Sequence, residues 1–290
     1  MGPTNRATST IAVVSAISAT IVIVMTVAFA TSSQVPETVR DFGGPVAPML
    51  EGWYRNADGT ATILLGFFNP NTVQAIELPV GDLNYFSTDP KDRGQPTYFP
   101  PGRSWGVLTV QVPGDFDGNL MWMLTANEQP TSIPLHLNSP YFIEPLRDAA
   151  NGNEPPTIRF EADGESFSGP PIGIAHSFTA TAGTPHDIRV WTSDVKSSVS
   201  NNARRRSRWP ALTLRWHLHR GPTELEFKDS IHRFQDSAEQ NPTTTVTFNK
   251  PGEYWLRAEV LDDTGVGGSG FQCCWTSALV QVSVVPQPTH

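Results

Sequence analysis

Short runs in which apolar and polar residues alternate recur along the chain between residues 49 and 284. Alternation with a period of two places the apolar side chains on one face of a β-strand, whereas a helix repeats every 3.6 residues. No long helical repeat of apolar residues follows Ala30. The pattern predicts an all-β protein of two tandem β-sandwich domains, preceded by an N-terminal hydrophobic export segment.

The first domain is expected to span residues 49–146. Its hairpin turn, Asn56-Ala57-Asp58-Gly59, contains an Asp-Gly pair, which favours the positive φ of a tight turn. Further strands are predicted at residues 50–55, 61–67, 73–80, 105–112 and 133–137. The strand from Leu120 to Leu124 is apolar at every position, so we expect it to be buried on both faces.

A linker rich in proline and small polar residues is expected at residues 147–156, and a second domain at residues 157–286. Its predicted strands alternate cleanly and are typical of antiparallel sheets buried on one face. They lie at residues 157–160, 177–182, 188–192, 212–218, 246–248, 254–260 and 276–284.

The segment Phe248-Asn249-Lys250-Pro251-Gly252-Glu253-Tyr254, with the alternating aliphatic residues up to Asp262, resembles the end of a PKD domain. In that family a Pro-Gly turn leads into a tyrosine-bearing strand, then an Asp-rich loop and a last strand. Leu212-Thr213-Leu214-Arg215-Trp216 is similar to the family's tryptophan-bearing strand. The resemblance implies an immunoglobulin-like (PKD-like) extracellular fold for the second domain and carries little functional specificity.

Residues 1–30 are interpreted as an export segment. Residues 11–30 are apolar or small and uncharged, and Ala28-Phe29-Ala30 matches an A-x-A cleavage site. Cleavage as a signal peptide and retention as a membrane anchor both remain open, because about 18 apolar residues can span a bilayer. A flexible lead-in is expected at residues 31–48. The predicted location is periplasmic, cell-surface or secreted, with membrane contact only through residues 11–30 if they are uncleaved.

The formal net charge of −8 argues against a general nucleic-acid binder, which needs a broad basic face. The chain also lacks the G-x-S-x-G, P-loop and H-E-x-x-H motifs. We therefore assign no catalytic residues. The leading hypothesis is a non-catalytic envelope or extracellular module for adhesion, scaffolding or assembly, whose partner is an envelope or extracellular protein or a polysaccharide.

A carbohydrate-binding module is the alternative, because flat aromatic rings stack on sugars. Residues 89–103 form a long loop in which Tyr98, Phe99 and Arg103 are candidate binding residues. A structural loop that closes the end of the sandwich explains the same residues. Trp255 and Trp275 are further binding candidates, and they are expected to be partly exposed, as are Trp53 and Trp105.

A metal-dependent enzyme is the second alternative. His217 and His219 are two apart on a predicted strand, so both imidazoles point to one side, and His232 is a possible third ligand. Exposed polar positions explain the histidines equally. No cofactor is required, although zinc at these histidines or calcium at Asp262 and Asp263 is possible.

The only two cysteines, Cys273 and Cys274, are adjacent at the start of the last strand. In a regular strand Cys274 points inward and Cys273 outward with Trp275, so the sulfurs diverge. A strained ring disulfide, two free thiols and an intermolecular bridge through Cys273 all remain open. We interpret the pair as a structural cap, with a redox role as the lesser alternative.

Overall fold

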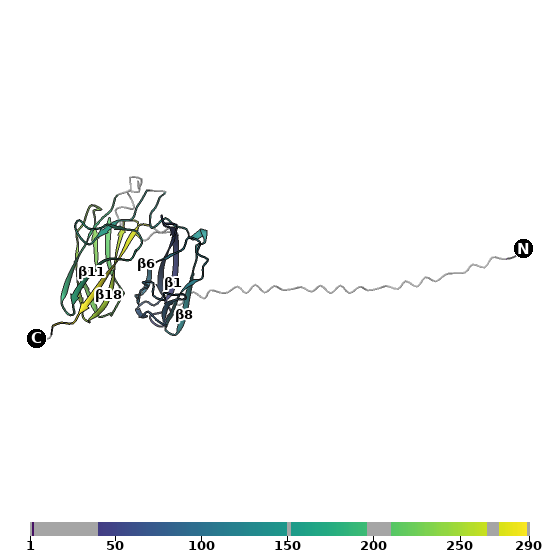
Figure 1. The fold of residues 1–290 in the computed structure, drawn as a ribbon, viewed down its shortest axis with the longest axis horizontal. Helices are drawn as coiled ribbons and strands as arrows, with labels where there is room; N and C mark the ends of the chain where they lie inside the picture. The colour runs from purple at the N-terminus through teal and green to yellow at the C-terminus, as the bar shows by residue number, and fades with distance from the viewer. Residues whose placement is uncertain (1, 3–39, 150–151, 196–209, 266–272, 289–290) are drawn as a thin grey trace. The chain divides into compact units, whose positions relative to one another are not determined.

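β-Strands, antiparallel except for the pair β11 and β19, build both halves of the computed structural model (Figure 1). The structure describes Gly2 and residues 40–149, 152–195, 210–265 and 273–288. Apart from Gly2, the export segment at residues 1–30 lies outside this part, as does the first half of the lead-in, residues 31–39. Residues 39–290 form one compact unit, which contains both sandwiches, and residues 1–38 form another. None of the described helices is long and apolar enough to span a bilayer.

The first sandwich packs two three-stranded sheets and a two-stranded ribbon around one core. One sheet has the order β1-β2-β6 and the other β4-β7-β8, while β3 pairs with β5. The strand bounds are β1 Ala47–Arg55, β2 Ala61–Asn69, β3 Ile76–Glu77, β4 Asn84–Phe86, β5 Tyr98–Phe99, β6 Gly102–Val112, β7 Leu120–Ala126 and β8 Gln129–Leu135. A 3-10 turn, η1 Ser139–Tyr141, follows.

The predicted Asp-Gly hairpin is confirmed: Gly59 has φ of +86°, and Asn56 N–H donates to the Thr60 carbonyl at 2.9 Å. Two strand predictions were wrong. Residues 73–80 form only the two-residue strand β3, Ile76–Glu77, and Pro79, which has no backbone N–H to donate, lies two residues beyond its end. In β7 only alternate residues are fully buried, and Met121 and Met123 are half-buried on the outer face. The fully apolar pattern therefore overstated the burial of β7.

The second sandwich has the strand arrangement of an immunoglobulin-like domain. Its five-stranded sheet has the order β11-β19-β18-β14-β16, and the facing sheet has the order β12-β17-β15. These sheets correspond to the CFG and BED sheets of that fold. The bounds are β9 Thr157–Arg159, β10 Phe167–Ser168, β11 Ile174–Thr181, β12 Pro185–Arg189, β13 Trp191–Ser193, β14 Leu212–Arg220, β15 Leu225–Lys228, β16 Ile231–Phe234, β17 Thr243–Phe248, β18 Gly252–Asp262 and β19 Trp275–Val285.

Two hallmarks of this fold are present. Trp216 on β14 is buried in the core, as the corresponding tryptophan is in immunoglobulin domains. Tyr254 on β18 is fully buried, and its hydroxyl donates to the Lys250 carbonyl at 2.7 Å, which is the tyrosine corner of this architecture. The turn predicted at Pro251-Gly252 is therefore fastened to the strand that follows it.

Replacing Tyr254 with phenylalanine should lower the free energy of unfolding by about 1 kcal/mol, because one buried hydrogen bond is lost while the ring stays. Urea unfolding followed by tryptophan fluorescence measures the change. Tyr141→Phe is the matched control, since the Tyr141 side chain is exposed. Equal effects of the two substitutions would contradict the role assigned to the corner.

Candidate functional site

The outer faces of the two sandwiches meet in a buried contact that we call the seam. A small apolar cluster spans it, joining Leu64 and Leu146 to Leu261 and Trp275. Polar and glycine residues surround that cluster. From the first sandwich these are Glu51, Gly66, Arg103 and Gly106, and from the second His217, His219, Arg257 and Glu259. An antiparallel sheet usually leaves its outer face in contact with water. At the seam, the outer face of each sandwich is covered by the other sandwich.

Glu51 on β1 reaches across β2 to β6. Its carboxylate accepts hydrogen bonds from Arg103 Nη2 at 2.7 Å and from the Gly106 N–H at 2.7 Å. The intervening residue is Gly66, and a Cβ there would overlap the Glu51 carboxylate and lie 2.7 Å from Arg103 Nη1. Glycine at position 66 is therefore what lets the carboxylate cross the sheet.

Trp275 of the second sandwich packs against the backbone of Gly106. Gly106 has φ of +53°, and a Cβ there would lie 3.0 Å from Trp275 Nε1. The indole is fully buried, and its Nε1 has no hydrogen-bond partner among the described residues. The expectation that Trp275 is partly exposed was therefore wrong, because the first sandwich covers the outer face of β19.

A buried charge cluster lies on the second sandwich at the seam. Glu259 accepts from Arg257 Nη1 at 3.2 Å and contacts His217 Nε2 at 3.2 Å, while Arg215 Nη1 lies 3.7 Å away. Arg257 also donates to Ser277 Oγ at 3.1 Å. Both partners of the Arg257–Glu259 pair are buried, so each charge depends on the other for its stability.

The loop before β5 completes the seam. His219 is buried, and its Nε2 lies 2.8 Å from the Gly94 carbonyl oxygen. Thr97 N–H donates to the His219 carbonyl at 2.9 Å, and Arg220 pairs with Asp92 at 2.6 Å. The loop that the sequence offered as a binding loop thus fastens one sandwich to the other.

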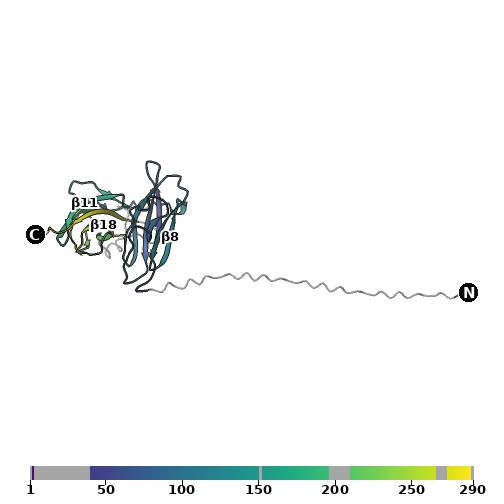
Figure 2. The ribbon, with the colours of Figure 1, turned by 60° about the horizontal axis from the view of Figure 1, so that its bottom comes forward.

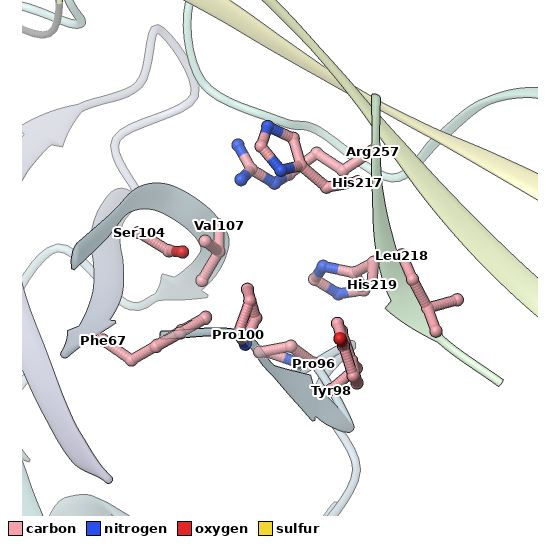
Figure 3. A pocket seen from close by; sticks show the side chains of 10 residues that line it. All are labelled: Phe67, Pro96, Tyr98, Pro100, Ser104, Val107, His217, Leu218, His219 and Arg257. Carbon is pink, nitrogen blue, oxygen red and sulfur yellow. The ribbon is translucent and has the colours of Figure 1, made fainter. Parts of the chain in front are cut away.

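A cavity lies between these residues (Figure 3). His217, His219 and Arg257 line it from the second sandwich, and Tyr98 and Ser104 from the first. The space open to the centre of a water molecule is about 10 Å³, which is room for about one water. The cavity is thus too small for a substrate of ordinary size.

Burial sets the protonation of the seam. It raises the pKa of Glu51 to about 7, although Arg103 and the Gly106 N–H oppose the shift. It lowers the pKa of His219 to about 3 and also lowers the pKa of His217, next to Arg257. Burial raises the pKa of Glu259, but the Arg257 charge and the His217 hydrogen bond outweigh it and bring that pKa to about 2. Both histidines are therefore neutral at pH 7.

The stability that neutral His219 contributes should be lost as the pH falls from about 6.5 toward 3. His219 has its lower pKa in the folded state, so the unfolded chain takes up the proton first. Glu51 has the opposite sign: its contribution is present below pH 4.5 and is lost as the pH rises through about 7. His219→Gln keeps a hydrogen-bond donor for the Gly94 carbonyl but removes the imidazole that takes up the proton. It should therefore reduce the acid-induced loss of unfolding free energy by roughly a few kcal/mol.

Urea titrations at pH 7, 5.5 and 4 measure this difference, with His136→Gln as the control, because His136 lies near η1 outside the seam. A difference in unfolding free energy between the wild type and His219→Gln that does not change from pH 7 to pH 4 would contradict the assignment.

The remaining binding candidates from the sequence also have structural partners. Phe99 is fully buried and packs edge-on against Phe67 in the first core. Tyr98 is half-buried at the cavity. The Arg103 guanidinium lies over the Trp105 ring at 4.0 Å from its centroid. Phe99 was therefore a wrong choice for a surface site, because β5 turns its side chain inward.

The tryptophan faces are occupied by side chains of this protein. Trp255 is half-buried, with the His219 ring stacked at 6.0 Å and the Arg220 guanidinium at 4.5 Å from its centroid. Trp53 is buried, contrary to expectation, because Phe142 packs edge-on against it at 5.1 Å. A sugar stacks on a ring face, and in both Trp255 and Trp105 an arginine guanidinium of this protein lies over the ring.

The structure separates the three histidines considered as metal ligands. His217 and His219 line one cavity, but His232 Nε2 contacts Thr244 Oγ1 at 2.7 Å, in the facing sheet. His232 was thus a wrong third ligand, because β16 directs it into the sandwich. The Asp262 carboxylate accepts from Asn153 and Thr264. Across the described ranges, no group of three or more His, Cys, Asp or Glu residues is placed to hold a metal ion. Zinc and calcium binding stay untested predictions.

Cys273 and Cys274 are joined by a disulfide between adjacent residues, and both are buried. Of the three alternatives left open by the sequence, the structure has the ring disulfide, and the divergence expected in a regular strand does not apply because β19 begins only at Trp275. Asn153 lies against both sulfurs, with its Nδ2 3.9 Å from Cys273 Sγ. The pair therefore packs against the segment that joins the two sandwiches.

Comparisons with known proteins give weak structural likenesses. No family model matches the chain, and no curated protein matches it. The D00-D0 domain of intimin is 12% identical, with 83% of this chain and 99% of that chain covered and a TM-score of 0.26. Two titin Ig tandem domains are 12% identical, covering 84% and 100%, with a TM-score of 0.22. The Yersinia pseudotuberculosis adhesin InvE is 10% identical, covering 82% and 60%, with a TM-score of 0.23. Likenesses of this size assign no function or partner.

Proposed function

We propose that this protein is an exported, non-catalytic scaffold of the cell envelope or extracellular space, in which two β-sandwiches are held as a rigid pair for adhesion or assembly. The seam is the observation that carries the proposal. A joint made of buried ion pairs and a seated tryptophan resists bending more than a solvated linker does.

The polar residues of the seam support a structural role over a catalytic one. His217 is bonded to Glu259, His219 to Gly94 and Arg103 to Glu51, so each candidate group for chemistry already has a partner within the protein. The cavity they line has room for about one water.

Export is proposed from residues 1–30, whose apolar run and A-x-A site are typical of a signal peptide or an anchor. We also propose that the second sandwich is a PKD-like module. The Pro251-Gly252 turn and the tyrosine corner at Tyr254 support this, because both belong to the strand pair on which the resemblance rests.

Two measurements on one sample test the proposal. The full chain, produced with its own N-terminal segment and a C-terminal tag, should be recovered outside the cytoplasmic compartment. Nuclear magnetic relaxation of the amide groups in that exported form should then give one rotational correlation time for both sandwiches. Cytoplasmic recovery would contradict export, and two separate correlation times would contradict the rigid pair.

A further inference from the structure

Strand β11 forms one margin of the five-stranded sheet and pairs only with β19 among the described strands (Figures 1 and 2). It runs parallel to β19 over eight residues, Ile174–Thr181. Within the described part of the chain, no further backbone hydrogen bond covers its outer side between Ile174 and Ala180. That side presents N–H and C=O groups that an added strand can pair with.

The sequence of β11 lacks the usual protection of an edge. It reads Ile-Ala-His-Ser-Phe-Thr-Ala-Thr, with no Lys, Arg, Asp, Glu or Pro. The other edge strands of the two large sheets of this sandwich are four or five residues long and carry such residues: Arg233 in β16, Glu226 and Lys228 in β15, and Pro185, Asp187 and Arg189 in β12. The edge strands β10 and β13 of the small sheet are only two and three residues long. Charges, proline and short length are the features that block strand addition, and β11 is the exception.

The strand is also held in a fixed position. His176 stacks on Phe160 with centroids 5.2 Å apart, and Phe178 stacks on His186 at 4.4 Å. Residues 160 and 186 lie on neighbouring segments, so β11 is fastened on its inner side while its outer edge stays open. Because β11 is already ordered, it loses little conformational entropy when a strand pairs with its edge.

A groove opens at the N-terminal end of β11. Its volume is about 270 Å³, and apolar side chains form most of its lining: Phe167, Pro170, Ile172, Ala175, Ala278 and Leu279. Glu165, Ser166, Ser168 and Ser277 complete it. Ile172 on its rim is 72% exposed, which leaves a large apolar side chain in water beside the open edge. The groove is smaller than a typical pocket for a drug-sized ligand and suits a single bulky side chain.

We propose that β11 is a docking edge, which takes an extended segment of a partner protein as an added strand and seats one bulky apolar side chain of that segment in the groove. Main-chain hydrogen bonds supply affinity in this mode of recognition, and the side-chain pocket supplies specificity. The inference deepens the proposed scaffold function, on which it rests, by naming the kind of partner and the surface it uses.

A second copy of this chain fits the groove less well than a different partner. In a two-fold antiparallel pair of β11 strands, the groove of one copy faces the residues that follow Thr181 in the other. Those residues are Ala182, Gly183 and Thr184, which have no bulky apolar side chain to fill it. The occupant is therefore an extended segment of another protein that carries such a residue.

Selection from a random 12-residue peptide library, displayed on phage and panned against the exported full-length protein, tests the proposal. The selected peptides should share one bulky apolar position, and synthetic copies should bind in a fluorescence anisotropy titration. Methylation of alternate backbone nitrogens on one edge of the peptide should abolish binding. Ile172→Asp, at an exposed position, should weaken binding about tenfold or more by removing the apolar rim.

Ile231→Asp is the matched control, because Ile231 is 43% exposed on β16, at the other edge of the same sheet. Its affinity for the peptides should equal that of the wild type. Three results would overturn the docking edge: no enriched peptide, binding that survives both Ile172→Asp and backbone methylation, or a dimer of this protein that Thr179→Lys dissociates. Export and the single correlation time test the scaffold proposal and do not depend on peptide binding. A negative peptide result would therefore overturn the docking edge alone.

Discussion

Replacing Gly66 with alanine should lower the free energy of unfolding by about 3–5 kcal/mol, although the residue lies in a strand and the change adds one methyl group. The new Cβ would overlap the Glu51 carboxylate and lie 2.5 Å from the Ser104 carbonyl oxygen. Glu51 would have to move, which breaks its bonds to Arg103 and to the Gly106 N–H. The cost therefore comes from the buried Glu51 carboxylate, which loses its hydrogen bonds to the half-buried Arg103 guanidinium and to the Gly106 N–H.

Urea unfolding of the full chain measures this cost, and Gly102→Ala is the comparison. Gly102 begins β6 with φ of +90°, and a Cβ added there would have no neighbouring atom within 4 Å. Alanine there should cost about 1 kcal/mol through backbone strain alone. If Gly66→Ala cost no more than Gly102→Ala, the crossing of β2 by Glu51 would not be a structural requirement.

Arg257→Met should destabilise the protein by about 3–5 kcal/mol, because it leaves the buried Glu259 carboxylate without its closest charge partner. The double variant Arg257→Met with Glu259→Leu should be more stable than Arg257→Met alone. Replacing both members of a buried pair with apolar groups removes the uncompensated charge. His217 would lose its acceptor in the double variant, so recovery should be partial.

The matched control is Arg147→Met, since Arg147 pairs with Glu154 at the surface and both side chains are largely exposed. That substitution should cost less than about 1 kcal/mol. A small effect of Arg257→Met, or a double variant less stable than the single one, would rule out a buried ion pair as a main support of the seam.

The alternation of apolar residues was enough to predict the long strands of both cores. The inward sets Ile63, Leu65 and Phe67 on β2 and Leu256, Ala258 and Val260 on β18 are buried as predicted. The short edge strands β15 and β16 were missed, because four residues with charges between apolar positions give too little pattern to distinguish from a loop.

The candidate site was predictable in its residue types and not in its role. Arg103, His217, His219, Trp255 and Trp275 were selected for binding or metal chemistry, and the structure brings all five to the seam or its margin. Glu51, Gly66, Arg257 and Glu259 were missed. Each occupies the outward position of an alternating strand, where a polar residue or glycine predicts contact with water.

The sequence by itself determined the all-β class, the inward face of each long strand, the Asp-Gly hairpin and the immunoglobulin-like character of the second sandwich. Only the tertiary structure decided what covers the outward faces. Burying a polar face is favourable only when its charges and hydrogen-bonding groups meet partners, and those partners come from strands far apart in the sequence. Arg103 and Glu51, 52 residues apart, are one such pair, and no local pattern contains both.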